Sequence, residues 1–348
     1  MKLLVSALEP SSNLHLKELL HYTQDIKLLG IFDKHITQDT PLYDMSRMAI
    51  MGVTDALKKL PWFLKIADEM LELAKDADKI LLMDSSGFNL PLAKKLKKNY
   101  PDKEIIYYIL PQVWASRPKR AEKLERYCDK LLGILPFEID YYPQRKAAYV
   151  GHPLLDEITV NRNEEACKNI IAFLPGSRKS EINRLMPIFL ELRRRLGNEI
   201  RPLLVIPQGF NRNEIAKLYR GNREFEIVRN THEALRRSEF AFICSGTATL
   251  EAALIGTPFT LAYIAKKIDF FIGTKLLKIK QVGLANIILT HYNDTRLHKE
   301  LLQKEVTVDN LLKAYYNTDK KIFAQKAEEL KKYLGHGSSK NVAKIIME

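Results

Sequence analysis

The 348-residue sequence predicts an α/β protein with two parallel β-sheets. Short, wholly apolar runs alternate with amphipathic stretches of helical period, and this alternation occurs once in each half of the chain. Strands that are buried on both faces and separated by helices are typical of parallel sheets built from βαβ units. Because the series occurs twice, we expect two Rossmann-like domains that face each other across a cleft.

The first half contains five predicted strands. They are expected at residues Lys2–Ala7, Ile26–Phe32, Lys79–Met83, Glu104–Leu110 and Lys130–Leu135. Helices are expected between them, where apolar residues recur at helical spacing, at His15–Tyr22, Phe63–Ala74 and Leu90–Lys98.

The second half repeats this arrangement. Its strands are expected at Asn169–Leu174, Arg201–Ile206, Phe225–Val228, Phe240–Cys244 and Pro258–Tyr263, and its helices at Ile182–Leu196, Arg212–Tyr219 and Thr249–Ile255. A further helix over Ile322–Tyr333 is followed by a glycine-containing break and a last short helix. We therefore divide the chain into residues 1–155, residues 156–330 and a tail of residues 331–348. The tail is expected to cross back to the first domain or to be exchanged in a homodimer.

The composition indicates a globular protein with an anionic partner. Hydrophobic residues make up 46% of the chain, and no apolar stretch approaches the roughly 18 residues needed to cross a bilayer. The cysteines Cys128, Cys167 and Cys244 lack metal or disulfide spacing, and Met1–Ser6 is too short for a secretory signal, so we expect a cytoplasmic protein. The net charge of +13 implies nucleic acid, an anionic membrane or a phosphorylated substrate. We do not expect nucleic acid, because the basic residues are dispersed and no recognition fold appears.

The segment Ser245–Glu251 carries the strongest functional pattern. It follows the apolar run Phe240–Cys244 and opens a predicted helix, with Gly246 and Thr247 in the turn. Such a turn brings free backbone N–H groups and the positive end of a helix dipole to one point, which suits a phosphate or diphosphate. Glu251, one turn into the helix, can accept hydrogen bonds from ribose hydroxyls. The alternative is an ordinary helix capped by Ser245 or Thr247.

A second loop of the same kind follows the strand that ends at Leu174. Gly176 permits a tight turn, Ser177 can cap the next helix, and Arg178 would lie beside its N-terminus, where a diphosphate is doubly favoured. Gln208 lies in a further loop after the strand that ends at Ile206. Arg178 alone would be an ordinary surface arginine. Two such loops at one sheet edge favour a diphosphate site.

Polar residues also follow two predicted strands of the first half. Asp84 comes directly after Lys79–Met83, and an aspartate at the carboxyl end of a parallel strand can act as a general base or bind a hydroxyl. The alternative is that Asp84 caps the helix that starts near Leu90. Trp114 lies among polar and basic residues after the next strand, a combination that suits a sugar or lipid headgroup, although most isolated tryptophans are core residues.

Two segments carry apolar side chains suited to a membrane surface. In the helix that begins near Pro61, one stripe can face the core and a second is turned away from it. The first stripe is Leu60, Leu64, Ala67 and Leu71, and the second is Trp62, Ile66, Met70 and Leu73. Residues 266–280 mix lysines with aromatic residues. The alternative for both segments is burial by neighbouring helices or by a subunit contact.

Six segments, in the expected order over nearly the whole chain, resemble those of lipid-A-disaccharide synthases, which are inverting glycosyltransferases of the two-Rossmann GT-B type. They are Pro111–Ala115 with Arg117, Lys119 and Arg120; Leu135–Glu138; Val150–Leu154; Leu174–Arg178 with Glu181 and Ile182; Ser245–Glu251; and Val282–Leu289. The resemblance implies transfer of 2,3-diacylglucosamine from UDP to the 6-hydroxyl of 2,3-diacylglucosamine 1-phosphate. It also implies an enzyme that is peripheral on the cytoplasmic face of the inner membrane.

The resemblance implies roles for particular residues. The UDP-sugar donor would be bound by Gly176, Ser177, Arg178, Gln208, Ser245, Gly246, Thr247, Thr249, Glu251 and Asn286. The acceptor would be bound by Ser12, His15, Met51, Asn89, Gln112 and Trp114. Neither a metal nor another cofactor is expected, because helix N-termini and basic side chains can stabilise the leaving UDP.

The chain departs from the family pattern near the expected base. The family usually carries a second acidic residue in the loop after the third strand, where this chain has Gly87. Near the N-terminus it lacks the family's glycine-rich turn but keeps Glu9, Ser12 and His15. The base is therefore expected to be Asp84, with Glu9 in reserve.

Two other sugar-nucleotide enzymes of the same fold are alternative functions. They are a UDP-N-acetylglucosamine 2-epimerase and a peptidoglycan-type N-acetylglucosaminyl transferase. The loop at residues 111–120 favours the synthase over both.

Overall fold

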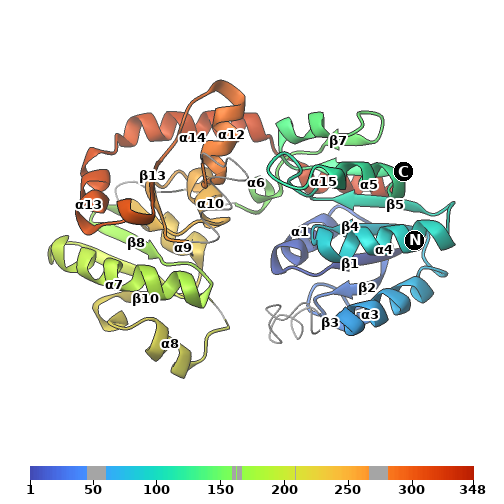
Figure 1. Ribbon diagram of the computed structural model, residues 1–348, viewed down its shortest axis with the longest axis horizontal. Helices are drawn as coiled ribbons and strands as arrows, with labels where there is room; N and C mark the ends of the chain where they lie inside the picture. The colour runs from blue at the N-terminus through green and yellow to red at the C-terminus, as the bar shows by residue number, and fades with distance from the viewer. Residues whose placement is uncertain (45–59, 159–161, 163–166, 208, 266–280) are drawn as a thin grey trace. The chain divides into compact units, whose positions relative to one another are not determined.

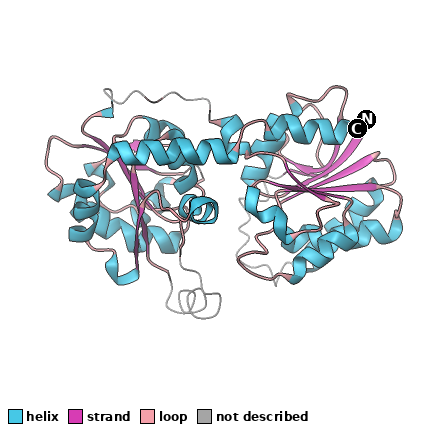
Figure 2. Ribbon diagram, turned by 90° about the horizontal axis from the view of Figure 1, so that it is seen from above, coloured by secondary structure: helices cyan, strands magenta, loops and turns pink. Residues whose placement is uncertain are grey.

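The structure is a computed structural model, and it describes residues 1–44, 60–158, 162, 167–207, 209–265 and 281–348. The chain divides into two compact units. The first unit comprises Met1–Glu157 together with Leu334–Glu348, and the second comprises Ile158–Tyr333. Each unit contains one parallel sheet with helices on both faces (Figure 1, Figure 2). The predicted α/β class with two Rossmann-like halves is therefore confirmed.

The sheet of the first unit has seven strands in the order β3-β2-β1-β4-β5-β6-β7, all parallel. The strands are β1 (Lys2–Ala7), β2 (Lys27–Phe32), β3 (Tyr43–Asp44), β4 (Lys79–Met83), β5 (Glu104–Tyr108), β6 (Lys130–Gly133) and β7 (Ala147–Tyr149). The helices are α1 (Pro10–Leu20), α3 (Leu60–Leu73), α4 (Ser86–Asn99), α5 (Lys119–Tyr127), the 3₁₀ helix η2 (Pro136–Tyr141), α6 (Pro153–Glu157) and α15 (Ser338–Met347).

Alternating strand residues supply two cores, one on each face of this sheet. Leu3 and Val5 of β1 pack with residues of α1 and with Val342 and Ile346 of α15. Leu4 points to the other face, where residues of α3, α4 and α5 cover the sheet. This period-two division of side chains is the reason the strand sequences are apolar throughout. The first unit therefore includes the last helix of the chain in its core.

The sheet of the second unit has six strands in the order β10-β9-β8-β11-β12-β13, also all parallel. The strands are β8 (Ile170–Leu174), β9 (Arg201–Val205), β10 (Glu226–Val228), β11 (Phe240–Ile243), β12 (Phe259–Tyr263) and β13 (Lys299–Leu302). The helices are α7 (Lys179–Arg195), α8 (Arg212–Leu218), η4 (Asn222–Glu224), α9 (Thr231–Arg236), α10 (Ala248–Ile255), α12 (Leu284–Asn293), η6 (Gln303–Glu305), α13 (Val308–Asn317) and α14 (Lys320–Leu334).

Both sheets reverse their strand order at one point. In the first unit the order turns between β1 and β4, and in the second between β8 and β11. In doubly wound sheets, ligands bind beyond the carboxyl ends of the strands at such a switch point. The loops that follow these four strands are therefore the places where functional side chains are expected.

The ten predicted strands are present, with ends within two residues of those expected, and three short strands were missed. The missed strands are β3, β7 and β13, each of which is an edge strand of its sheet. The strand predicted to reach Leu110 ends at Tyr108 because Ile109 has a φ of 65°, which no strand accommodates. The helix predicted from Leu90 begins at Ser86 and contains Pro91 in its interior.

The assignment of the two apolar stripes on α3 was wrong. Ile66 and Met70, expected to be turned away, are fully buried against the sheet, whereas Leu64 of the first stripe is 58% exposed. The side chain of Leu60 and residues 266–280 lie outside the described part of the chain. The core therefore takes Ile66 and Met70 from the second stripe, with Ala67 and Leu71 of the first partly buried against it, and leaves Leu64 in solvent.

Candidate active site

Two carboxylates flank the switch point of the first sheet. Glu9 follows β1 and Asp84 follows β4, and these strands run side by side with Ala7 opposite Met83. The hydroxyl of Ser85 donates to Oε1 of Glu9 at 3.2 Å and so ties the two loops together. Desolvation raises the pKa of Glu9, and the negative charge of Asp84 raises it further. Burial also raises the pKa of Asp84, while the backbone N–H of Ser85 and the side chain of His15 oppose that increase.

The Asp84 loop has a strained backbone. Asp84 and Ser85 have φ values of 49° and 37°, in the left-handed region that residues other than glycine seldom adopt. Asn89 holds this conformation, since its amide donates to the carbonyl oxygens of Met83 at 2.9 Å and Asp84 at 3.0 Å. The N-cap of α4 is Ser85, without a side-chain capping bond, so the alternative in which Asp84 caps this helix does not hold. Strain of this kind concentrates at functional sites.

The residues expected to bind the acceptor fall into three groups. Ser12 and Asn89 are fully buried, and His15 is buried and contacts Glu157 through Nδ1. Trp114 is partly buried and meets the ring of Phe137 edge-on, with centroids 5.3 Å apart, while Gln112 is exposed. Met51 lies outside the described residues. The structure therefore places His15 and Asn89 beside Asp84, leaves Ser12 buried in the first turn of α1, and puts Gln112 and Trp114 after the neighbouring strand β5.

The first loop of the second unit is built around Gly176. Its φ is 102°, and a Cβ there would lie 2.6 Å from Oε2 of Glu181, so only glycine fits. Glu181 is buried and accepts hydrogen bonds from both the backbone N–H of Arg178 at 3.3 Å and its guanidinium at 2.9 Å. The Arg178 side chain is nevertheless 78% exposed. Glu181 thus orients a cation that faces solvent, and Ser177 beside it is exposed too.

The second loop leaves the adjacent strand, since Ile243 of β11 pairs with Leu174 of β8. Gly246 has a φ of 145°, and α10 begins at Ala248 directly after it. Thr247 is the N-cap residue, as the alternative of an ordinary capped helix expects, but it makes no side-chain capping bond. Thr249 is buried and donates to the carbonyl oxygen of Gly246 at 2.8 Å, which stabilises the turn. The N–H groups of Thr249 and Leu250 donate to the carbonyl oxygens of Gly246 at 3.2 Å and Thr247 at 2.9 Å, which leaves the N–H groups of Thr247 and Ala248 as the ones suited to an anion.

Glu251 and Asn286 have different surroundings. Oε2 of Glu251 lies 3.3 Å from Nε2 of His232, and Glu251 keeps partial exposure. Asn286 is 1% exposed, and its amide makes four hydrogen bonds, to the carbonyl oxygen of His298, to Glu300 and from the N–H groups of Leu297 and His298. Asn286 therefore holds the turn before β13 and presents no free polar atom to a ligand. Gln208 lies outside the described residues.

Sequence reasoning assigned no role in the site to four residues that support it, although Glu181 belongs to one of the family-like segments. Ser85 bonds Glu9, Glu157 contacts His15, Glu181 anchors Arg178 and His232 contacts Glu251. Only Glu181 and Ser85 lie within three residues of a predicted site residue, so local spacing could have indicated them. Glu157 is 142 residues from His15 in the chain, and no pattern in one sequence shows that contact.

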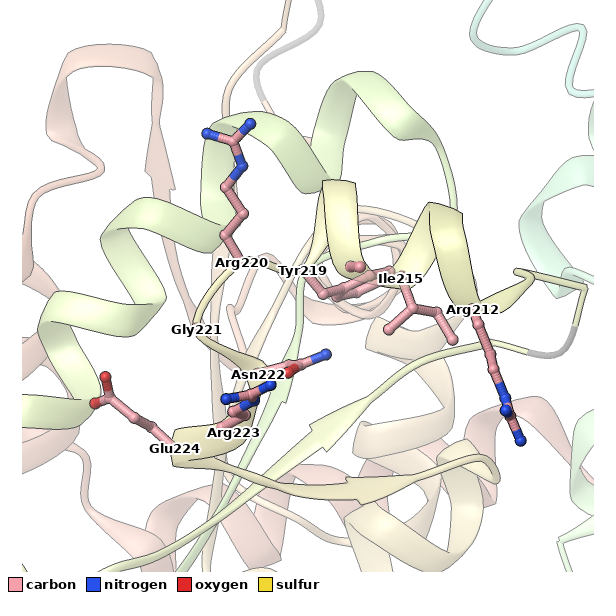
Figure 3. Close-up of a pocket in the computed structure, with 9 residues that line it drawn as sticks. Arg212, Ile215, Tyr219, Arg220, Gly221, Asn222, Arg223 and Glu224 are labelled. Atoms are coloured by element: carbon pink, nitrogen blue, oxygen red, sulfur yellow. The ribbon is translucent and has the colours of Figure 1, made fainter.

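A pocket of about 590 Å³ lies elsewhere on the second unit, along α8 and η4 (Figure 3). It is lined by Arg212, Ile215, Ala216, Tyr219, Arg220, Gly221, Asn222, Arg223 and Glu224. Arg212 and Arg220 point away from each other (Figure 3), so their guanidinium groups do not converge on a common ligand. None of the predicted donor-binding residues lines this pocket.

The described residues contain no group of three or more His, Cys, Asp or Glu side chains that could hold a metal ion. They also contain no helix that is both long and apolar enough to cross a membrane.

Comparison with known proteins decides the family. Residues 3–347 match the family model described as lipid-A-disaccharide synthetase. The chain belongs to this family. It is 47% identical to the lipid-A-disaccharide synthase of Helicobacter pylori strain J99, over 98% of this chain and 96% of that protein. It is 45% identical to the lipid-A-disaccharide synthase of Campylobacter jejuni strain RM1221, over 99% of each chain. Like other members of the lipid-A-disaccharide synthetase family, it is a glycosyltransferase of lipid A biosynthesis.

Solved structures of low sequence identity share the fold of this family member. The UDP-GlcNAc 2-epimerase of Neisseria meningitidis, bound to UDP-GlcNAc, covers the whole chain with a TM-score of 0.65 and 11% identity. The spinosyn rhamnosyltransferase SpnG covers it with a TM-score of 0.60 and 12% identity. At these identities the likeness shows the fold alone.

Proposed function

We propose that this enzyme transfers 2,3-diacylglucosamine from its UDP derivative to the 6-hydroxyl of 2,3-diacylglucosamine 1-phosphate, with inversion at the anomeric carbon. The products are the β-1,6-linked disaccharide 1-phosphate and UDP. The proposal depends mainly on one observation: the two switch points carry opposite charge. Carboxylates flank the first, and an exposed arginine with two glycine turns flanks the second. A base for a hydroxyl and a cationic site for a diphosphate are the two things this reaction needs.

We assign the base to Asp84. Desolvation and the charge of Asp84 both raise the pKa of Glu9, whereas His15 favours the ionised form of Asp84. Burial also brings the pKa of Asp84 closer to neutral pH, where a general base is most effective. The carboxylate takes the proton of the acceptor hydroxyl as its oxygen forms a bond to the anomeric carbon. The bond from that carbon to the UDP oxygen breaks on the opposite face.

We assign the UDP-sugar to the second unit. The turn at Gly176–Arg178 and the turn at Ser245–Ala248 leave adjacent strands, so a diphosphate can contact both. Arg178 and the N–H groups of Thr247 and Ala248, where α10 begins, would stabilise the negative charge that develops on the leaving UDP. Glu251 would accept hydrogen bonds from the ribose. Because these groups supply the stabilisation that a divalent cation provides in other transferases, we propose that the reaction is metal-independent.

We propose that the acyl chains and the membrane meet the first unit near α3 and α4. Phe63 contacts Trp62 and Phe88, with ring centroids 5.1 and 5.8 Å away, and Leu64 is 58% exposed. Phe88 lies in the first turn of α4, four residues after Asp84. An apolar, aromatic surface beside the base suits a diacylated sugar that stays partly in the bilayer. The enzyme would then be peripheral on the cytoplasmic face of the inner membrane, with its net charge of +13 favouring anionic lipids.

We also propose a homodimer in which residues 334–348 of two copies are exchanged. Val342, Ala343 and Ile346 of α15 are buried in the first unit, and Gly335 and Gly337 precede the helix with positive φ values. A helix buried in this way and joined through glycines can pack on its own unit or on a second copy. Sedimentation equilibrium of the full chain tests this: a monomer at micromolar concentration contradicts it.

The assay that tests the function combines UDP-2,3-diacylglucosamine and 2,3-diacylglucosamine 1-phosphate in detergent with EDTA, with mass-spectrometric detection. Disaccharide 1-phosphate and UDP are the expected products. Product that forms only when a divalent cation is added would contradict metal independence and leave the transfer intact. Donor that is bound and epimerised or hydrolysed without transfer would contradict the assigned acceptor.

A further inference from the structure

Glu157 makes a contact in the first unit that the proposed reaction has not used. It ends α6, and its Oε1 contacts Nδ1 of His15 on α1. The side chains of His15 and Glu157 are only 9% and 14% exposed. A hydrogen bond between a buried imidazole and a buried carboxylate is charge-assisted and shielded from water, so it holds the ring in one orientation.

The groups around His15 show which of them can hold it. Asp84 lies close enough that His15 opposes the rise in its pKa, and Tyr108 of β5 lies near the carboxylates of Glu157 and Asp156. The Tyr108 hydroxyl lies 2.9 Å from that of Ser338, and Tyr107 donates to the Asp84 carbonyl oxygen. From α6 and the residues before it come His152, Asp156 and Glu157.

Of the three polar side chains on the α6 side, Asp156 and His152 make hydrogen bonds elsewhere, and only Glu157 bonds to His15. Asp156 accepts from the N–H groups of Gly337 at 2.7 Å and Ser339 at 2.9 Å. Burial lowers the pKa of His152 to about 3, so this ring stays neutral, and its Nδ1 accepts from the N–H of Leu154. Among the described residues, therefore, the side-chain hydrogen bond of His15 goes to Glu157 alone.

The two nitrogens of an imidazole have linked roles. When Nδ1–H donates to a carboxylate, the tautomer and the direction of Nε2 are both set by that bond. Nε2 of His15 has no hydrogen-bond partner among the described residues. Nε2 is thus the ring atom that can bind a ligand. His15 lies on α1, which begins directly after Glu9.

We propose that Glu157 is a positioning residue, which orients His15 through Nδ1 so that Nε2 binds the acceptor beside Asp84. This inference rests on the proposed function, because it assigns the acceptor to the first unit. Glu157 acts through His15 and does not touch substrate. Removing a carboxylate with this kind of role typically costs about 10- to 100-fold in activity.

The test compares Glu157→Ala and Glu157→Gln with the parent enzyme. The glutamine carbonyl can still accept from Nδ1–H, so Glu157→Gln should keep most activity. Glu157→Ala should lower kcat/KM for the acceptor about 10- to 100-fold and leave the KM for the UDP-sugar unchanged. The matched control is Glu18→Ala, which removes the carboxylate of a second His–Glu pair on the same helix, where His21 is 62% exposed. It should leave both constants unchanged. Equal losses in the alanine and glutamine variants would overturn the inference.

A double-mutant cycle keeps the inference testable even if Glu157→Ala lowers stability. If Glu157 acts only through His15, the pair Glu157→Ala with His15→Ala should be no slower than His15→Ala alone. If the loss of activity in the double variant equalled the product of the two single losses, the inference would be overturned.

A ¹⁵N-histidine NMR spectrum of the full chain separates this inference from the proposed function. The Nδ1–H signal that disappears in His15→Ala should also disappear in Glu157→Ala and persist in Glu157→Gln. A signal that persists in Glu157→Ala would contradict the positioning role while disaccharide is still formed. If the parent enzyme formed no disaccharide, the proposed function would fail, and the NMR result would still decide whether Glu157 holds His15.

Discussion

The two units use one sheet topology for opposite electrostatic purposes. Each sheet reverses between two neighbouring strands, and a pair of loops follows those strands. In the first unit the loops carry Glu9 and Asp84, whose pKa values are raised. In the second unit they carry Gly176 and Gly246 in glycine-only conformations, with Arg178 exposed beside them.

The difference shows that the topology determines where a site lies and the loops determine its chemistry. The acidic pair is held by side-chain bonds from Ser85 and Asn89, and it favours a neutral hydroxyl that must lose a proton. The glycine turns instead present backbone N–H groups and favour an anion. Substitutions in one unit should therefore affect a different kinetic constant from those in the other.

The largest expected effect is that of Asp84→Asn. Removing the base should lower kcat by about 10²- to 10⁴-fold, because general base catalysis contributes that range. UDP-sugar affinity should hardly change, since the donor contacts lie in the second unit. Steady-state kinetics and calorimetric titration with UDP measure the two effects. Unchanged turnover would remove Asp84 from the mechanism and leave Glu9 as the candidate base.

Arg178→Ala should affect donor binding and turnover together. Loss of a charge-assisted hydrogen bond to the diphosphate costs roughly 1.5–3 kcal/mol, or about 10- to 100-fold in kcat/KM for the donor. The control is Arg194→Ala, which removes an exposed, ion-paired arginine from the same helix. If the two variants behaved alike, Arg178 would be an ordinary surface residue.

The pH profile should separate the two units further. The base must be ionised, and the pKa of Asp84 is raised above its ordinary 3.8, so kcat/KM should begin to fall at a higher pH than for an exposed aspartate. His15 opposes this shift, so His15→Ala should move the acid limb to still higher pH. The affinity for UDP, measured by calorimetry, should not fall over the same pH range. A limb that stays in place in His15→Ala would show that His15 does not influence Asp84.

The smallest expected effects are on thermal stability. Asp84→Asn in the first unit should raise it, and Gly176→Ala in the second should lower it. A carboxyl whose folded-state pKa is raised contributes its full stabilisation below its unfolded pKa, and that contribution is lost as pH rises through the folded value. At pH 7, Asp84→Asn should therefore raise Tm, and asparagine tolerates the left-handed backbone there. Gly176→Ala should lower stability by about 1–3 kcal/mol, because its Cβ would clash with Glu181. Thermal unfolding at pH 7 measures both, and a rise in Tm for Gly176→Ala would contradict the tight turn.

Much of the fold could be predicted from the sequence, because strands such as β4 and β11 are apolar throughout and lie between helices of clear period. Strands β3, β7 and β13 could not, because edge positions leave one side unpaired and need no continuous apolar run. The sequence also could not predict which face of α3 is buried, because both of its stripes are apolar and only packing buries Met70 and exposes Leu64.

The loops of the candidate site could be located from the sequence, but the partners of their residues could not. Gly176 and Ser245–Glu251 follow strands, and that rule needs no tertiary information. The contact of Glu157 with His15 joins positions 142 residues apart. Asn286 shows the converse error: its residue type suits a ligand contact, but four internal hydrogen bonds occupy its amide.

Residues 334–348 have a consequence for how the chain folds as it is synthesised. Most of the first unit is formed by residues 1–157, but the core on one face of its sheet also needs Val342 and Ile346 from the end of the chain. All residues of the second unit leave the ribosome before these side chains do. At roughly 5–20 residues per second, the second unit has a complete set of strands while the first still exposes the apolar surface that α15 will cover. The unit that is translated first is thus the one that is completed last.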